Sequence, residues 1–105
     1  MTVAQGEVWW ADLPEPKGSG PGFRRPVVVV QGEPLNRSAI ATVVCVPLTS
    51  NLKWATAPGN VVLSPSATGL GKESVANVSQ VVTLDQVDLT ERTVVGQFES
   101  ASAAS

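Results

Sequence analysis

Residues 25–31, Arg25-Pro26-Val27-Val28-Val29-Val30-Gln31, carry the clearest structural signal in the sequence. The four consecutive valines favour a β-strand, because a β-branched side chain is stiff at χ1 and packs well on a pleated sheet. The run has no polar alternation, so this strand is expected to be buried on both faces. Pro26 has a fixed φ and biases Arg25 toward an extended conformation. The stretch therefore predicts an arginine held at the mouth of a buried strand.

The rest of the chain has the same strand character, with 18 valines against eight leucines and one isoleucine. The prolines and glycines fall mostly between apolar runs, as turn residues do. Such short strands predict a small β-barrel or sandwich, with one domain over residues 1–98 and a loose tail over 99–105. Further strands are expected over residues 6–12, 39–49, 59–63, 74–84 (one long or two short) and 93–98, a short helical turn over 85–92, and loops over 13–23, 32–38, 50–58 and 64–72.

Four residues within these strands carry further expectations. Trp9 and Trp10 are adjacent, so a regular strand must direct them to opposite faces, one into the core and the other over a loop or interface. Pro47 lies near the exit of a strand, where a sheet edge or a bulge would tolerate it. Cys45 lies inside a valine-rich strand and is expected to be an inert core residue.

The bulk composition restricts the chemistry. The chain has 105 residues, which suits one domain, and it has no histidine and a single cysteine. The commonest general base is therefore missing, and a zinc site of the Cys/His kind is excluded. No apolar run is long enough to span a bilayer, the N-terminus does not resemble a signal peptide, and one cysteine suits a reducing compartment. A cytoplasmic protein that does not contact membranes is expected.

The charge is unevenly distributed along the chain. Its net value is −2, but residues 1–72 hold six basic and four acidic groups, whereas residues 73–105 hold one basic and five acidic groups. A basic patch for a nucleic acid is therefore expected within the first two thirds of the sequence.

Several short segments together resemble the MazF/PemK toxins in order and spacing. The similarity covers about residues 5–98 and departs from many relatives at Gly20, where they carry an acidic residue, and at Val82, where they carry a basic one. The matching segments are Gly6-Glu7-Val8-Trp9-Trp10, Gly18-Ser19, Arg25-Pro26-Val27-Val28-Val29, Val46-Pro47-Leu48-Thr49 and Ser79-Gln80.

The resemblance implies a mainly β, SH3-like barrel that forms a homodimer and cleaves single-stranded RNA without a metal or cofactor. The expected ends are a 2′,3′-cyclic phosphate and a 5′-hydroxyl. Relatives usually end in a C-terminal helix, which this sequence does not show. The implied partner is a cognate antitoxin, with a disordered acidic segment expected to cover the RNA groove. The resemblance maps catalytic roles onto Arg25 and Thr49, and candidate RNA contacts are Ser19, Gly20, Arg24, Lys53, Trp54, Ser79 and Gln80.

The chemistry is reasonable on physical grounds. RNA supplies its own nucleophile, the 2′-hydroxyl, so the protein must mainly stabilise the charge that develops on phosphorus oxygens. Arg25 offers a planar fork of donors for those oxygens, and Thr49 offers a hydroxyl hydrogen bond. The base that takes the 2′-hydroxyl proton is left open, because arginine is a poor base at pH 7.

Two other functions are compatible with such a fold. One is a gyrase-poisoning toxin like CcdB, which would bind protein and would not need the pair of Arg25 and Thr49. The other is a non-catalytic SH3-like binding module, which usually presents an aromatic groove, whereas this chain has only five aromatic residues. A fold cannot separate these functions, so the site residues must.

Overall fold

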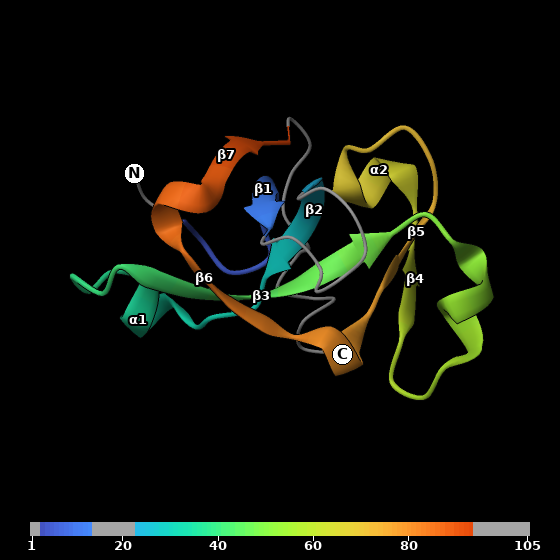
Figure 1. Cartoon of the computed structure of the whole chain (residues 1–105), viewed down its shortest axis with the longest axis horizontal. Coiled ribbons are helices and arrows are strands. Elements are labelled where there is room, and N and C mark those ends of the chain that lie inside the picture. The colour runs from blue at the N-terminus through green and yellow to red at the C-terminus, as the bar shows by residue number, and fades with distance from the viewer. Residues whose placement is uncertain (1–2, 14–22, 94–105) are drawn as a thin grey trace.

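A computed structural model describes residues 3–13 and 23–93; residues 1–2, 14–22 and 94–105 lie outside the description. Seven strands dominate the described ranges, and short helical turns connect them (Figure 1). The mainly β class predicted from the sequence is confirmed. The strands are β1 (Val8–Leu13), β2 (Phe23–Val29), β3 (Thr42–Thr49), β4 (Val61–Leu63), β5 (Ser74–Ala76), β6 (Val82–Asp85) and β7 (Leu89–Arg92), and the turns are α1 (Glu33–Asn36), η1 (Leu52–Thr56), α2 (Pro65–Thr68), η2 (Val78–Gln80) and η3 (Gln86–Asp88).

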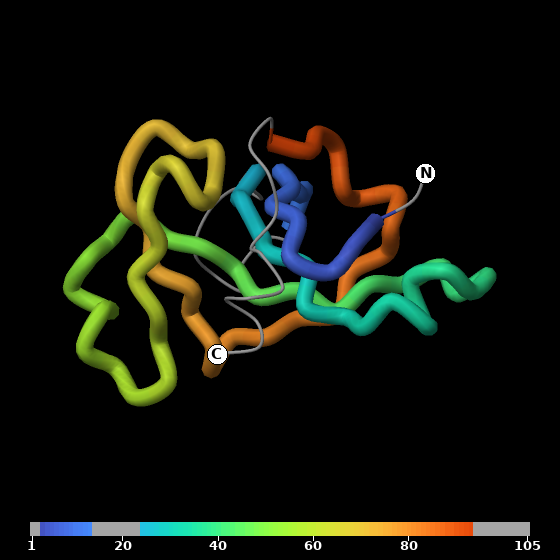
Figure 2. Tube along the Cα trace, turned by 180° about the vertical axis from the view of Figure 1, so that it is seen from behind, coloured from blue at the N-terminus to red at the C-terminus, as the bar shows by residue number. Residues whose placement is uncertain are grey.

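The strand β3 organises the sheet. The hydrogen-bonded order is β4-β5-β3-β2-β1-β7, and β6 pairs with the first part of β3. The pairings between the described strands are all antiparallel. Figure 1 shows β3 crossing the molecule, with α1 near its start and β4, β5 and α2 near its end, and Figure 2 shows the same two ends from behind. The end of β3 is therefore where β2, β5 and η1 come together.

Alternating side chains of the central strands supply two hydrophobic clusters. Val8, Val28 and Val46 lie opposite one another in register and belong to one cluster. Their neighbours Trp9, Val27 and Val29, among others, belong to a second cluster. Full burial of such a side chain contributes about 1.5–3 kcal/mol. The valine run is thus apolar throughout because its strand packs on both faces.

Burial of the valine run and the placement of the two tryptophans in different surroundings are confirmed, although the strand ends before Val30. Val27, Val28 and Val29 are buried, although Val30 lies beyond the strand and is 39% exposed. Trp9 is buried in one cluster, whereas Trp10 is only partly buried and lines a surface hollow.

Of the two expectations for Pro47, the sheet edge was wrong, whereas the pairing on one side of Pro47 is irregular. Pro47 pairs with Val27 in the central strand β3, and the structure has no sheet edge there. Its carbonyl accepts a hydrogen bond from the Asn77 N–H at 3.0 Å, on the side where β3 changes its partner strand from β6 to β5. The nitrogen of Pro47, which has no hydrogen to donate, is directed to the same side. A central strand tolerates this proline because the ladder is interrupted on that side.

Several predicted boundaries were also wrong. Strand β7 occupies Leu89–Arg92, where a helical turn was expected, and only η3 (Gln86–Asp88) is helical there. Three predicted loops contain the short helical elements α1, η1 and α2. The tail and most of the strand expected over residues 93–98 lie outside the described residues, as does any C-terminal helix.

Cys45 is fully buried, and burial raises the pKa of its thiol to about 12. The thiol is therefore protonated at neutral pH, as expected for an inert core cysteine. Within the described ranges, no helix has the length and apolar character needed to cross a bilayer.

Candidate active site

The pairing of β2 with β3 brings the two predicted catalytic residues together. Val27 pairs with Pro47, which is the last pair between the two strands at this end, and Arg25 and Thr49 each lie two residues beyond that pair. Side chains at such positions lie on the same face of a sheet and are cross-strand neighbours. Both residues are partly buried and line the same hollow. The sequence places them 24 positions apart, and only the antiparallel pairing makes them adjacent.

This hollow, called the amide hollow here, has a volume of about 550 Å³. Its lining is notable for carboxamides and hydroxyls, which can read base edges by hydrogen bonding. Among the described residues that line it there is no carboxylate, so Arg25 provides the formal charge. The lining residues are Leu13, Arg25, Pro47, Leu48, Thr49, Asn51, Trp54, Ala57, Asn77, Ser79 and Gln80.

The Thr49 hydroxyl is oriented by the turn that follows β3. Its Oγ1 accepts a hydrogen bond from the Asn51 N–H at 3.1 Å. Accepting that bond leaves the hydroxyl hydrogen able to be donated to a ligand. The Asn51 side chain in turn accepts from the Lys53 N–H at 3.2 Å and caps η1. The strand end, the hydroxyl and the start of η1 are therefore connected by hydrogen bonds.

A single asparagine links the two turns that border the amide hollow. The Asn60 Nδ2 donates to the Trp54 carbonyl at 3.0 Å and lies 3.4 Å from Asn77 Oδ1, while Asn60 Oδ1 accepts from the Val78 N–H at 2.9 Å. The Asn77 N–H also donates to Pro47 of β3. Asn60 thus connects η1, η2 and the central strand, although it does not itself line the hollow.

Trp54 forms an exposed wall of the hollow, and Lys53 lies beside it. The Trp54 side chain is 45% exposed, and Lys53 Nζ lies 5.4 Å from the centre of its ring. An exposed indole with an adjacent cation is suited to stacking a base.

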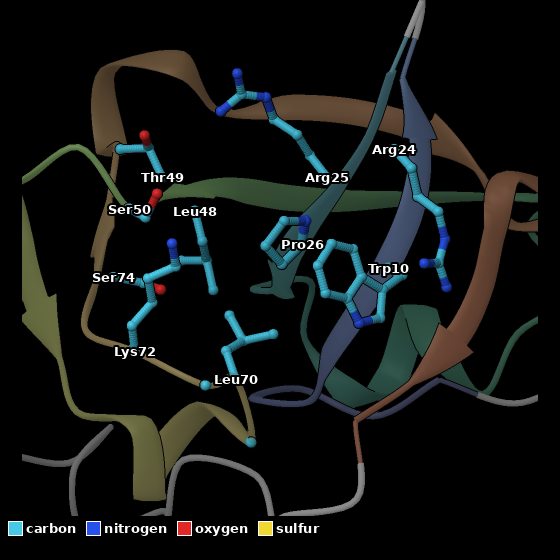
Figure 3. Close-up of a pocket in the computed structure, with 12 residues that line it drawn as sticks. Trp10, Arg24, Arg25, Pro26, Leu48, Thr49, Ser50, Leu70, Lys72 and Ser74 are labelled. Carbon is cyan, nitrogen blue, oxygen red and sulfur yellow. The ribbon is translucent and has the colours of Figure 1, made fainter.

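A second hollow of about 540 Å³, called the Trp10 hollow here, shares part of its lining with the first, and Figure 3 shows the residues that line it. In Figure 3, Trp10 and Arg24 lie together on one side, Thr49 and Ser50 lie on the other, and Arg25 lies between them. The guanidinium of Arg24 lies 4.8 Å from the centre of a Trp10 ring. The two hollows share Arg25, Leu48 and Thr49.

The structure groups most, but not all, of the residues predicted from the sequence. Arg25, Thr49, Trp54, Ser79 and Gln80 line the amide hollow. Arg24 lies in the Trp10 hollow, and Lys53 lies beside Trp54. Ser19 and Gly20 lie outside the described residues.

Sequence reasoning missed Asn51, Asn77, Trp10 and Lys72. Asn51 follows Thr49-Ser50 at the strand exit, so its position was a usable signal. The roles of Trp10 and Lys72 had no such signal, because 62 positions separate them in the sequence and the fold alone brings them to one hollow. Among the described residues, no group of three or more His, Cys, Asp or Glu side chains is arranged to hold a metal ion.

The structure is thus that of a small, mainly β domain with a polar groove and an arginine–hydroxyl pair at the end of its central strands. Residues 4–104 match the family of PemK-like, MazF-like toxins of type II toxin–antitoxin systems. Endoribonuclease MazF2 of Mycobacterium bovis and endoribonuclease MazF6 of Mycobacterium tuberculosis are each 48% identical over 92 residues, which cover 88% of this chain and 81% of each relative. Endoribonuclease EndoA of Bacillus subtilis is 33% identical over 92 residues, which cover 88% of this chain and 78% of EndoA.

A solved structure of an endoribonuclease in complex with its cognate antitoxin, from a mycobacterial species, is also similar. Its TM-score is 0.66 at 26% sequence identity, and the match covers 98% of this chain and 83% of that one. This likeness confirms the mainly β fold of the MazF/PemK type that the resemblance predicted. The chain belongs to the PemK/MazF family of type II toxins.

Proposed function

We propose that this protein is a sequence-selective endoribonuclease that cleaves single-stranded RNA at the amide hollow. The observation that carries the proposal is that Arg25 and Thr49 line one hollow together with several carboxamides. Its membership of a family whose relatives are named endoribonucleases supports the same activity. A gyrase poison or a binding module would not need this pair, so RNA cleavage is favoured.

In the proposed reaction the 2′-hydroxyl loses its proton to a base as its oxygen bonds to the adjacent phosphorus, the bond from phosphorus to the 5′-oxygen of the next nucleotide breaks, and that oxygen takes up a proton. The products are a 2′,3′-cyclic phosphate and a 5′-hydroxyl. Negative charge develops on the nonbridging oxygens, where the guanidinium of Arg25 forms charge-assisted hydrogen bonds. Thr49 donates its hydroxyl hydrogen to the same oxygens, because its Oγ1 already accepts from the Asn51 N–H. Removing one such preorganised donor typically lowers the rate by about 10²–10³.

Selectivity is assigned to the side chains around that pair. Asn51, Asn77 and Gln80 present amides that can pair with base edges, and Trp54 presents an exposed ring for stacking. Base edges are accessible only in unpaired RNA, so the substrate is a single strand.

The proposed regulation is binding of a cognate antitoxin, whose acidic segment covers the groove and pairs with Arg25. We place the protein in the cytoplasm as a homodimer. The similar solved structure is an endoribonuclease in complex with its antitoxin, which supports the first part of this proposal.

The test is incubation of the purified protein with a long unstructured RNA in EDTA, followed by mapping of the cut ends. Cuts at a few short motifs with 5′-hydroxyl ends are expected. Arg25→Ala should abolish them, whereas Arg37→Ala should not, because Arg37 is exposed at the end of α1 and lines neither hollow. Equal cleavage by Arg25→Ala and the parent would show that the site is wrong.

A further inference from the structure

The Trp10 hollow has no role in the cleavage step described above, yet it adjoins the residues that perform it. Arg25, Leu48 and Thr49 line both hollows. A polynucleotide held with its scissile phosphate at Arg25 must extend in both directions from that point. The amide hollow receives one side of such a strand, and the Trp10 hollow is the adjoining space for the other.

The charge of the Trp10 hollow suits an anionic ligand. Arg24, Arg25 and Lys72 line it, and the part of the chain that the structure describes contributes no carboxylate to its lining. This local excess of positive charge occurs in a chain whose net charge is −2. Nucleic-acid backbones are recognised mainly by such clusters of cations.

The Arg24 side chain already has an anionic partner, which a phosphate can replace. Its Nη2 lies 2.9 Å from Glu91 Oε1, and the two side chains are 46% and 69% exposed. Ion pairs this exposed are weak. A phosphate oxygen can therefore take the place of the Glu91 carboxylate while Arg24 remains over the Trp10 ring.

The remaining lining combines apolar surface with the hydroxyls of Thr49, Ser50 and Ser74, and it differs from that of the amide hollow, which includes carboxamides. Trp10, Pro26, Leu48 and Leu70 provide apolar surface, and the hollow has no Asn or Gln among its described lining residues. An aromatic platform binds any base through its π-face, whereas carboxamides distinguish bases by their edges.

We propose that the Trp10 hollow is a subsite for a nucleotide flanking the scissile phosphate, bound by stacking and phosphate charge without selection of the base. This proposal rests on the proposed function. It divides the groove into an amide hollow that selects sequence and a Trp10 hollow that adds affinity.

The experiment measures binding of RNA oligonucleotides that carry a 2′-deoxy sugar at the cleavage position, so that they cannot be cut. One series is lengthened by one to three nucleotides on the 5′ side of that position, and another on the 3′ side. In the parent protein, lengthening on one side should tighten binding by about tenfold, which is the size of one base–aromatic stack. Changing the added base should alter the affinity by less than about threefold.

Three variants assign that gain to the hollow. Trp10→Leu should abolish the gain and Trp10→Phe should retain most of it. Lys72→Gln, at an exposed residue, tests the charge without disturbing the core, and should lower the slope of log affinity against log salt by about 0.7. Arg37→Gln is the control and should leave both the gain and the slope unchanged, because it lies away from the hollow.

The proposal is wrong if Trp10→Leu and Lys72→Gln keep the full gain, or if the gain depends on one particular base. It is also wrong if these variants bind RNA normally but lose affinity for a synthetic acidic peptide, which would make the hollow a protein-docking site. These results differ from failure of the proposed function, in which the parent protein neither binds nor cuts any unstructured RNA.

Discussion

The substitution Asn60→Ala is the sharpest test of how the groove is held in shape. It removes the hydrogen bonds at 3.0 Å to the Trp54 carbonyl and at 2.9 Å from the Val78 N–H, together with the longer contact at 3.4 Å to Asn77. Because Asn60 is partly exposed, water replaces some of these bonds, and the free energy of unfolding should fall by about 1–2 kcal/mol. For a domain of this size the melting temperature should then fall by roughly 5–15 °C.

The substitution should also affect RNA binding more than catalysis. Trp54 and η2 border the amide hollow, so loss of their shared anchor should raise KM by roughly 3–10-fold, the equivalent of about one hydrogen bond. The value of kcat should change by less than about twofold, because Arg25 and Thr49 are positioned by β2 and β3. Steady-state kinetics on a short RNA, at a temperature where parent and variant are both folded, measure both quantities.

Asn36→Ala is the matched control. Asn36 is buried and also makes three side-chain hydrogen bonds, to the Gln31 carbonyl, Gln31 Nε2 and Glu33 Oε1, but at the opposite end of β3. It should lower the melting temperature at least as much as Asn60→Ala and leave KM unchanged. Equal KM values for the two variants would refute the argument that Asn60 positions the groove.

Two further predictions concern stability. Cys45 has its pKa raised to about 12 by burial, against an ordinary value near 9, so the folded state holds the thiol proton more tightly than the unfolded state does. Its contribution to stability is full below pH 9 and is lost as the pH rises from 9 toward 12. Urea unfolding of the parent and of Cys45→Ala should show the difference between their free energies of unfolding shrinking over that range. A constant difference would contradict the burial of this thiol. Gly59 has φ +83° and space for a Cβ, so Gly59→Ala should lower the free energy of unfolding only through backbone strain, by about 1–2 kcal/mol. Gly71 has similar space and no positive φ, so Gly71→Ala should be close to neutral in thermal unfolding.

The sequence predicted most of the strands because their signal is local. The valine run, the alternation around Trp9 and Trp10 and the proline and glycine turns each depend on neighbouring residues. Pro47 was placed wrongly because its environment depends on the junction of β5 and β6, which are distant in the sequence. Strand β7 was mistaken for a helical turn because it is short, and its pairing with β1 outweighs the low strand preference of Glu91.

The candidate site was predicted only where motif residues marked it. Arg25, Thr49 and Gln80 were found through an ordered set of segments that resembles a family. The roles of Asn60 and Lys72 could not be predicted, because they arise from hydrogen bonds and a hollow that only the folded chain creates. Local sequence patterns therefore predict strands and turns, whereas the residues that line a groove are set by contacts between segments distant in the sequence.

The most direct test of the central claim is a double-mutant cycle between Arg25 and Thr49 in single-turnover cleavage of one RNA. Arg25→Ala and Thr49→Val should each lower the rate by about 10² or more, with Thr49→Ser retaining most of the activity because it keeps the hydroxyl. If the two side chains stabilise the same phosphorane oxygens, the double variant should be much less impaired than the product of the single losses. A strictly multiplicative loss, or a Thr49→Val enzyme as fast as the parent, would contradict the claim that the pair forms one site.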